Sequence, residues 1–425
     1  MKYLQKQVLL LSGILFATSL ANAQQGFDPA RLARIDSLIT RHINKQHIPG
    51  ATALIIRNGQ IIYNKAFGYA DAAAKKPMQT NSIFRIASQS KAITSLAVMM
   101  LWEEGKFLLD DPVSDYIPAF KNPRVLVHFN AADSSYTTRP ASREITIRDL
   151  LRQSSGIAYP AIFSDHTMWA IYTKAGIPSG IGTTRSTIKE KMALLAQMPL
   201  QHDPGAAFTY GLNTDLLGYL VEIWSGQPFD VFLRKRVFEP LEMTDTWFHL
   251  PAGLQNRLVT LYESKGAALL PVTHPIYEGV DPLFPNLGGT YLSGGAGLSS
   301  TVADYAKFLS LYLNKGVYKH KRLLGRKTVE LMLTNQLTDS MRISPLPPQP
   351  ENFQFSLAGF ALETAKNNYL LPFSTGTFGW GGAFNTHYWA DPQEQLVGLL
   401  FTQEYLSPYW RIGEEFKVAV YQAME

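Results

Sequence analysis

The sequence predicts an α/β (α+β) fold whose antiparallel sheet is formed by both ends of the chain and flanked by helices. Two observations lead to this prediction. Apolar residues recur at helical spacing near each terminus, and beside each helical segment two strand-like apolar runs are separated by a turn. The predicted helices span residues 28–47 and 414–424. The predicted strands span residues 51–56, 60–67, 384–390 and 395–402.

Turn residues bound each of these elements. Pro49-Gly50 ends the first helix, Arg57-Asn58-Gly59 separates the first two strands, and Asp391-Pro392 separates the last two. The long middle of the chain, about 110–327, is predicted as a mostly helical insertion. Residues 24–425 are then a single domain, with its α/β part at about 24–109 and 328–425.

The N-terminus has the three parts of a secretory signal peptide. Lys2 and Lys6 precede an apolar segment from Val8 to Leu20, and Ala21-Asn22-Ala23 supplies small residues for cleavage. The apolar segment is too short for a membrane span. We therefore expect residues 1–23 to be removed after Ala23 and the protein to be secreted into the periplasm, without a membrane span.

Composition is that of an ordinary globular protein, with 46% hydrophobic and 17% charged residues and no cysteine. Disulfides and thiol chemistry are therefore excluded. Loss of the signal peptide removes Lys2 and Lys6 and lowers the formal charge from +5 to +3. So small a surplus does not indicate a nucleic-acid partner, and the basic stretch 319–322 is interpreted as a solvated face.

The most informative motif is Ser88-Gln89-Ser90-Lys91, directly ahead of an apolar run at 92–102 that predicts a buried helix. Residues three apart on a helix point the same way. A serine hydroxyl needs a neighbouring base to become a nucleophile, and a lysine can serve only in a buried, cationic setting. Ser88 would also lie at the positive end of the helix dipole. As a bare pattern, Ser-x-x-Lys more often marks a helix start with a solvated lysine.

Two later segments supply possible partners for Ser88. Tyr210 follows a Pro-Gly turn in a glycine-rich bend, before a helix that runs through Trp224. Near the C-terminus, the segment 376–388 has glycines inside a strand pattern, which indicates close backbone approach of the kind that an oxyanion site requires. Alone, these segments are also what turn chemistry and a bulged strand look like.

Other catalytic classes lack support. The nine histidines form no recognisable Ser-His-Asp order, and no Gly-x-Ser-x-Gly elbow occurs. There is no His-Glu-x-x-His motif, and His42 and His47 are five apart and do not share a helix face. No metal site and no cofactor is predicted.

Taken together, the ordered motifs resemble the serine β-lactamase and penicillin-binding-protein superfamily. The similarity is greatest to the class C β-lactamase-like branch that includes the family VIII carboxylesterases. It extends from about residue 28 to the end of the chain. Supporting segments in the family's order lie at 104–113, 145–156, 240–246 and 295–305.

The resemblance implies a β-lactamase/transpeptidase-like catalytic domain and a role for each motif. Ser88 would be the acylated nucleophile, Lys91 would hold the proton network, and Tyr210 would be the general base and then the acid for the leaving group. The backbone N–H groups of Ser88 and Ala383 would bind the oxyanion. Trp380, Gly381 and Gly382 would line the substrate site.

Two departures from the family pattern bear on the substrate. The family's Tyr-x-Asn has Leu212 in its third position, and Asn213 falls one residue late, so its amide-binding role is not transferred. The position of the family's cation in Lys-Thr-Gly or His-x-Gly holds Trp380, followed by Gly381-Gly382. An indole removes the charge that would bind a substrate carboxylate, and an aromatic wall suits neutral esters.

The leading hypothesis is an esterase or acyltransferase acting on small neutral esters. The first alternative is a β-lactamase or D-amino-acid peptidase with an altered anion site, and the second is a non-catalytic protein that binds cell-wall fragments. The substrate would be a small ester or a cell-wall-derived molecule. The sequence indicates neither the natural ester nor the oligomeric state. Residues 344–352, rich in proline, form a loop that is either a lid or a surface connection.

Overall fold

The computed structural model describes residues 26–160, 166–182, 186–277, 279–343, 352–366 and 371–425. The predicted signal peptide, residues 1–23, lies outside these ranges. So does the loop predicted at 344–352, except for its last residue. No helix in the described part of the chain combines the length and apolarity needed to cross a bilayer.

Ten α-helices and eighteen strands are assigned in the described ranges. The helices are α2 (Pro29–Asn44), α3 (Ser90–Glu103), α4 (Ile147–Leu151), α5 (His166–Lys174), α6 (Ile188–Leu195), α7 (Asn213–Ser225), α8 (Phe229–Leu233), α9 (Val302–Leu313), α10 (Arg326–Met332) and α11 (Ile412–Gln422). The strands of the large sheet are β1 (Gly50–Arg57), β2 (Gln60–Asp71), β3 (Lys76–Pro77), β14 (Ala361–Leu362), β15 (Phe378–Gly382), β16 (Thr386–Asp391) and β17 (Leu396–Phe401). The shorter strands are β4 (Phe84–Arg85), β5 (Arg124–Asn130), β6 (Ser135–Pro140), β7 (Ala207–Phe208), β8 (Tyr262–Lys265), β9 (Ala268–Pro271), β10 (Ser299–Ser300), β11 (Val317–Tyr318), β12 (Lys321–Arg322), β13 (Arg342–Ile343) and β18 (Glu404–Tyr405).

The large sheet joins the two ends of the chain, as the sequence predicted. Its strand order is β14-β15-β16-β17-β1-β2-β3, and each neighbouring pair is antiparallel. The junction is the pairing of β1 with β17, in register from Thr52 opposite Phe401 to Arg57 opposite Leu396. Both predicted hairpins and both predicted terminal helices are present, so the fold-class prediction is confirmed.

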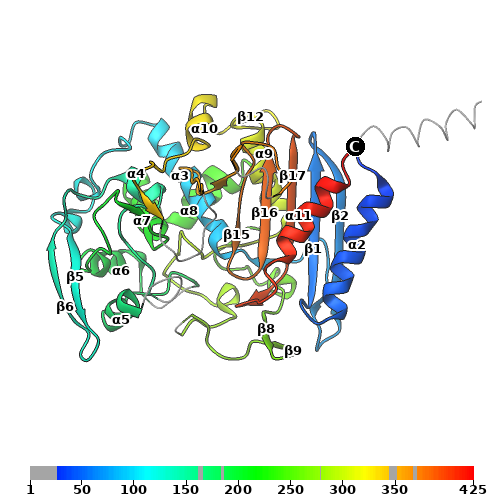
Figure 1. Cartoon of the computed structure of the whole chain (residues 1–425), viewed down its shortest axis with the longest axis horizontal. Helices are drawn as coiled ribbons and strands as arrows, with labels where there is room; N and C mark the ends of the chain where they lie inside the picture. The colour runs from blue at the N-terminus through cyan, green and yellow to red at the C-terminus, as the bar shows by residue number, and fades with distance from the viewer. Residues whose placement is uncertain (1–25, 161–165, 183–185, 278, 344–351, 367–370) are drawn as a thin grey trace, which may run out of the picture.

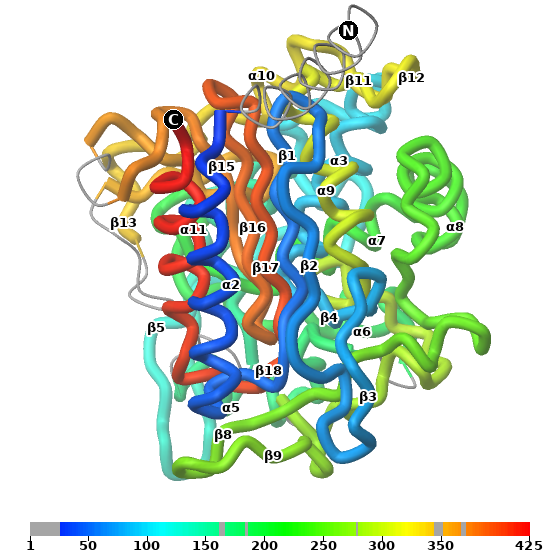
Figure 2. Tube along the Cα trace, turned by 90° about the vertical axis from the view of Figure 1, so that its right-hand side faces the viewer, coloured from blue at the N-terminus to red at the C-terminus, as the bar shows by residue number. Residues whose placement is uncertain are grey.

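Successive residues of the central strands point to opposite faces of the sheet, and each face has its own apolar core. On one face, Ala53 and Leu400 pack with Ile39 of α2 and Phe416 of α11. These two helices lie side by side over this face of the sheet (Figure 2). Leu54 and Leu399 belong to the larger core on the other face.

The larger core continues from the sheet into the helical middle of the chain. There α3 is buried on all sides from Ser90 to Leu101 and packs against α7. Helices α5 and α6 and the β5–β6 hairpin lie at the end of the molecule opposite α2 and α11 (Figure 1). Helix α9 falls inside the range predicted as an insertion, but it packs against β1, β16 and β17. The boundaries of that insertion remain a prediction.

Gly398 offers a test of how closely residues pack on the face of the sheet that α2 and α11 cover. It lies opposite Trp389 on β16, and a Cβ at this position would come within 2.2 Å of the indole. We expect Gly398→Ala to destabilise the protein by about 1–3 kcal/mol in urea unfolding, because the indole would have to shift inside a dense core. Gly253→Ala, where a Cβ meets nothing within 4 Å, is the matched control. Equal effects of the two substitutions would contradict this account.

Candidate active site

Ser88 lies in a 3₁₀ turn, Ala87–Gln89, that continues directly into α3. Its side chain is half-buried, whereas its chain neighbours are buried. Ala87 has a φ of 42°, in the left-handed region that non-glycine residues rarely adopt. Such a conformation persists only where the surrounding structure holds it. The turn therefore presents a single accessible hydroxyl at the start of a buried helix.

Gln89, the next residue, connects this turn to two other elements through hydrogen bonds. Its carbonyl accepts a hydrogen bond from Tyr305 of α9, at 2.9 Å, and its side-chain amide donates to Thr386 of β16, at 3.0 Å. Gln89 itself is fully buried. The hydroxyl of Ser88 is thus positioned by both the large sheet and a helix that packs on it.

Lys91 is buried, with 1% of its surface exposed. Its ammonium donates hydrogen bonds to the Tyr159 hydroxyl, at 2.8 Å, and to the Gly295 carbonyl, at 3.0 Å. It also lies 4.5 Å from the centre of the Tyr210 ring, within the range of a cation–π interaction. Lys91 is therefore not the solvated lysine that a bare Ser-x-x-Lys pattern more often indicates.

Tyr210 is buried between β7 and the start of α7. The next residue, Gly211, allows a close backbone approach, because a Cβ there would lie 2.1 Å from the Ile157 carbonyl. Its N–H donates to the Gln153 side chain, at 3.2 Å. These contacts hold the segment of Tyr210 against the segment that contains Tyr159. The centres of the two tyrosine rings are 5.8 Å apart, and the lysine nitrogen lies 5.3 Å from the first and 4.5 Å from the second.

Trp380 contacts Tyr210 directly. Its indole N–H donates a hydrogen bond to the Tyr210 hydroxyl oxygen, at 3.1 Å, and the two rings are 5.6 Å apart. The other side of the indole packs with Phe355 and Phe353, at 5.7 and 6.3 Å between ring centres. The residue in the position of the family's cation is thus a neutral donor to the tyrosine oxygen, inside an aromatic cluster.

The glycines of β15 divide between the two faces of the sheet. A Cβ on Gly382 would lie 2.3 Å from the carbonyl of Ile86, so the end of β15 rests against the residue two before Ser88. Ala383 follows at once and begins the turn to β16. Gly381 is instead covered by Trp410, which a Cβ there would approach to 2.7 Å. The fold therefore brings Gly382 and Ala383 beside the Ser88 turn, while Gly381 contacts the opposite side.

Three residues to which sequence reasoning gave no role complete the surroundings of Lys91. Tyr159 and Gly295 accept its hydrogen bonds. A Cβ on Gly295 would lie 2.6 Å from a carboxylate oxygen of Asp215 and 3.4 Å from the lysine nitrogen, so this glycine leaves room for the two charges to approach. All three occur in or beside segments that carry the family resemblance. Nothing local in the sequence indicates that they converge on Lys91.

Asp215 is completely buried on α7. One carboxylate oxygen accepts a hydrogen bond from the Tyr291 hydroxyl, at 2.9 Å, and the other has no partner among the described residues. Burial raises the pKa of Asp215 to about 6, although the nearby Lys91 charge and hydrogen bonds oppose the rise. Burial likewise raises the pKa of Tyr159 well above its ordinary value, with the charges of Tyr210 and Asp215 adding to the effect. Tyr159 therefore keeps its proton.

Asn213 is not available to a substrate. It is fully buried at the start of α7, where it accepts a hydrogen bond from Ser155 and donates one to Gln153, at 2.9 Å. These bonds tie α7 to the loop that leads to Tyr159. Asn213 therefore does not take the amide-binding role of the family's asparagine, as its one-residue shift in the motif indicated.

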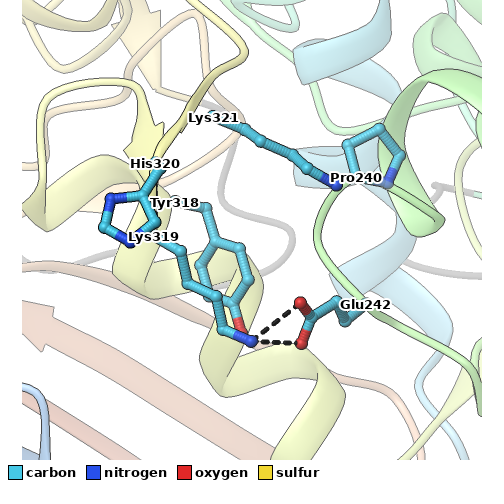
Figure 3. Close-up of a pocket in the computed structure, with 6 residues that line it drawn as sticks. All are labelled: Pro240, Glu242, Tyr318, Lys319, His320 and Lys321. Carbon is cyan, nitrogen blue, oxygen red and sulfur yellow. Dashed lines mark hydrogen bonds and ion pairs between the residues drawn. The ribbon is translucent and has the colours of Figure 1, made fainter.

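Residues 319–321 of the basic stretch line a pocket that contains none of the predicted site residues. There the Lys319 ammonium donates to both carboxylate oxygens of Glu242, at 2.7 and 2.6 Å (Figure 3). The described residues contain no group of three or more histidine or acidic side chains arranged to hold a metal ion. Within the described residues, the candidate catalytic groups are concentrated around Ser88 and Lys91.

The raised pKa of Asp215 predicts a specific pH dependence of stability. Its pKa is about 6 in the folded protein and 3.8 in the unfolded chain, so its contribution is most favourable below about pH 4 and is lost as pH rises to about 6. Asn cannot ionise. We expect the unfolding free energy of Asp215→Asn, relative to the natural protein, to increase by about 3 kcal/mol over that interval in urea titrations. Asp339→Asn, at an exposed position, is the matched control. A difference for Asp215→Asn that is constant with pH would contradict the assignment.

Comparison with known proteins gives a consistent result. Residues 35–419 match the family model described as Beta-lactamase. Esterase EstB of Burkholderia gladioli is 31% identical over 69% of this chain and 73% of its own length. A putative D-alanyl-D-alanine carboxypeptidase of Escherichia coli K12 is 29% identical over 74% of this chain and 71% of its own.

Among solved structures, EstCE1, described as a hydrolase with promiscuous acyltransferase activity, superimposes with a TM-score of 0.76. It is 28% identical, and the alignment covers 92% of this chain and 99% of EstCE1. The family model spans most of the chain, and the serine-lysine helix, the paired tyrosines and the glycine-rich strand meet at one place in the fold. The chain belongs to the β-lactamase family.

Proposed function

We propose that the protein is an exported serine hydrolase that forms an acyl-enzyme on Ser88, and that it acts on small neutral esters as an esterase or acyltransferase. The observation that carries this proposal is the hydrogen bond from the neutral Trp380 indole to the Tyr210 oxygen. It supplies a donor where related enzymes of the family use a cation, and it adds no charge to attract a substrate carboxylate.

In the proposed reaction the Ser88 oxygen attacks the ester carbonyl while Tyr210 accepts its proton. The carbonyl oxygen becomes an oxyanion, which the backbone N–H groups of Ser88 and Ala383 stabilise. Collapse of this intermediate breaks the bond to the alcohol, which leaves with the proton returned by Tyr210. Water, or a second alcohol, then attacks the acyl group by the same steps and releases Ser88.

Lys91 supports this chemistry as a fixed positive charge against the ring of Tyr210. Tyr159 is the alternative candidate for the base because it binds the same ammonium. Its oxygen accepts the Lys91 hydrogen bond deep in the core, so we assign it the role of holding Lys91 in place. Tyr210 alone of the two also receives the Trp380 hydrogen bond, which stabilises negative charge on its oxygen.

The surroundings of Trp380 support a neutral substrate. The half-buried indole, backed by the buried rings of Phe353 and Phe355, offers an aromatic surface that suits an acyl chain or a neutral ester. The similarity to EstB and to EstCE1 also supports esterase and acyltransferase chemistry.

A β-lactamase or D-amino-acid peptidase with an altered anion site is the second candidate. The specific observation in its favour is the 29% identity to the putative carboxypeptidase of Escherichia coli. A non-catalytic protein that binds cell-wall fragments is the third. A buried Lys91 bonded to one tyrosine and stacked against another argues against it, because binding alone does not require so costly a buried charge.

The deciding measurement is intact-protein mass after brief exposure to p-nitrophenyl butyrate and, separately, to a penicillin. We expect a butyryl adduct that forms and then disappears as the ester turns over, because the oxyanion site and Tyr210 would serve both half-reactions. Ser88→Ala should give no adduct. Ser95→Ala, which removes another hydroxyl from α3, is the matched control and should behave as the natural protein.

Other results of this mass measurement would favour the other candidate functions or reject the enzymatic proposal. A stable penicilloyl adduct without ester turnover would favour a peptidase or penicillin-binding role. The absence of any adduct with either reagent would reject the enzymatic proposal.

Trp380→Phe tests the hydrogen bond to Tyr210 apart from the aromatic surface. An aromatic ring is retained but the hydrogen-bond donor is lost, so we expect kcat/KM to fall about tenfold. The loss should be similar for esters of every acyl length. Phe355→Leu, which alters the packing behind the indole and leaves the donor, should instead change the ranking of acyl lengths. A Trp380→Phe variant with natural rates would show that the indole N–H has no part in catalysis.

A further inference from the structure

The turn between β15 and β16 presents the Ala383 N–H, and its geometry depends on Asn385. The turn consists of Ala383, Phe384 and Asn385. Asn385 has a φ of 62° and is completely buried. Asparagine tolerates this left-handed conformation better than most residues, but a buried amide must still find partners for its oxygen and nitrogen.

The amide nitrogen of Asn385 donates to the carboxylate of Glu404, at 2.7 Å, and to the hydroxyl oxygen of Ser407, at 3.1 Å. The same Glu404 carboxylate accepts from the Ser407 hydroxyl, at 2.8 Å. The N–H of Glu404 also donates to the carbonyl of Phe384, at 3.1 Å. Both the backbone and the side chain of this residue therefore hold the turn.

His387 fixes the other half of the Asn385 amide. Its Nε2 lies 2.7 Å from the amide oxygen. Burial lowers the pKa of His387 to about 3, so the ring is neutral and has one N–H to donate. With that N–H on the amide oxygen, the Asn385 nitrogen is directed at Glu404. The turn is thus clamped from two sides.

The burial of the Glu404 carboxylate is energetically unfavourable. Glu404 is fully buried, and one of its carboxylate oxygens has no hydrogen-bond partner among the described residues. Burial raises the pKa of its carboxyl to about 7, against the effect of its two hydrogen bonds. A neutral glutamine would also offer an acceptor, without the cost of a buried charge. What the carboxylate adds is a stronger, charge-assisted hydrogen bond to Asn385.

We infer that Glu404 is a positioning residue that, through Asn385, holds the Ala383–Asn385 turn so that the Ala383 N–H is directed at the reacting oxygen. The inference rests on the proposed function. It extends the catalytic machinery to a residue beyond β17, which contacts neither Ser88 nor the substrate. The loss of an oxyanion donor costs about 10²- to 10³-fold in kcat, and misdirection of one should cost less.

The test compares Glu404→Gln with the natural protein in hydrolysis of p-nitrophenyl butyrate. We expect kcat to fall about 10- to 100-fold while KM changes less than about twofold, because ester binding does not use the developed oxyanion. Inhibition by an alkyl trifluoromethyl ketone, which adds a serine to form a tetrahedral oxyanion, should weaken by the same factor as kcat. Glu222→Gln, at a half-buried glutamate near the end of α7 whose carboxylate accepts from the backbone N–H of Phe229, is the matched control and should change neither value more than about twofold.

Asn385→Gly is the second variant and guards against poor folding of Glu404→Gln. Glycine adopts the left-handed conformation freely, while the side-chain bonds to Glu404, Ser407 and His387 are lost. It should reproduce the loss in kcat, and the double variant should lose little more than the worse single one, because both changes act through one clamp.

The results separate the two hypotheses. A natural protein that turns over the ester, with Glu404→Gln and Asn385→Gly lowering only the melting temperature, would overturn the role of Glu404 and leave the proposed function intact. A natural protein that never acylates Ser88 would overturn the proposed function and the positioning role with it.

Discussion

The arrangement of the candidate site depends on the burial of one ammonium group. Removal of a lysine charge from water costs several kcal/mol unless polar partners surround it. Lys91 has such partners in Tyr159 and the Gly295 carbonyl, with the Asp215 carboxylate nearby. Each comes from a different part of the chain. The loop after α4, the start of α7 and the glycine-rich loop before β10 must therefore all be in place before Lys91 can be buried. This requirement gives a physical reason for the occurrence of several weak motifs together in one chain.

The same network explains how an indole can occupy the position of a cation. A second buried positive charge beside Lys91 would be repelled by it and would need a counter-ion of its own. The Trp380 N–H donates to the Tyr210 oxygen without that cost, and its ring extends the apolar contacts of Phe355. Among the residues described around Tyr210 here, Lys91 is the cation, and it lies against the tyrosine ring. Under the proposed function, selectivity for neutral esters and assistance to Tyr210 would be two consequences of one residue.

Periodicity and turn chemistry were sufficient to predict the terminal helices, both hairpins and the sheet that joins the chain ends, since these patterns are local. The spacing of Ser88 and Lys91 was likewise a local signal. Tyr159 and Asp215 were missed as partners of Lys91 because only the tertiary fold brings residues so distant in sequence together. Glu404 was missed for a different reason. A glutamate after an apolar strand ordinarily indicates exposed surface, and its burial follows from the left-handed Asn385 that it must hold.

The two proposed oxyanion donors share one structural device. Ala87, just before Ser88, and Asn385, two residues after Ala383, both have positive φ values. Such conformations cost about 1–3 kcal/mol each and persist only under external constraint. The constraint on the first turn comes from the hydrogen bonds of Gln89 to Tyr305 and Thr386. Glu404 and His387 constrain the second turn through Asn385. Because Thr386 directly follows Asn385, the two clamps meet on one strand, and the two N–H groups are fixed relative to each other before substrate arrives. Donors oriented in advance need no reorganisation as negative charge develops, which is the condition for strong electrostatic catalysis.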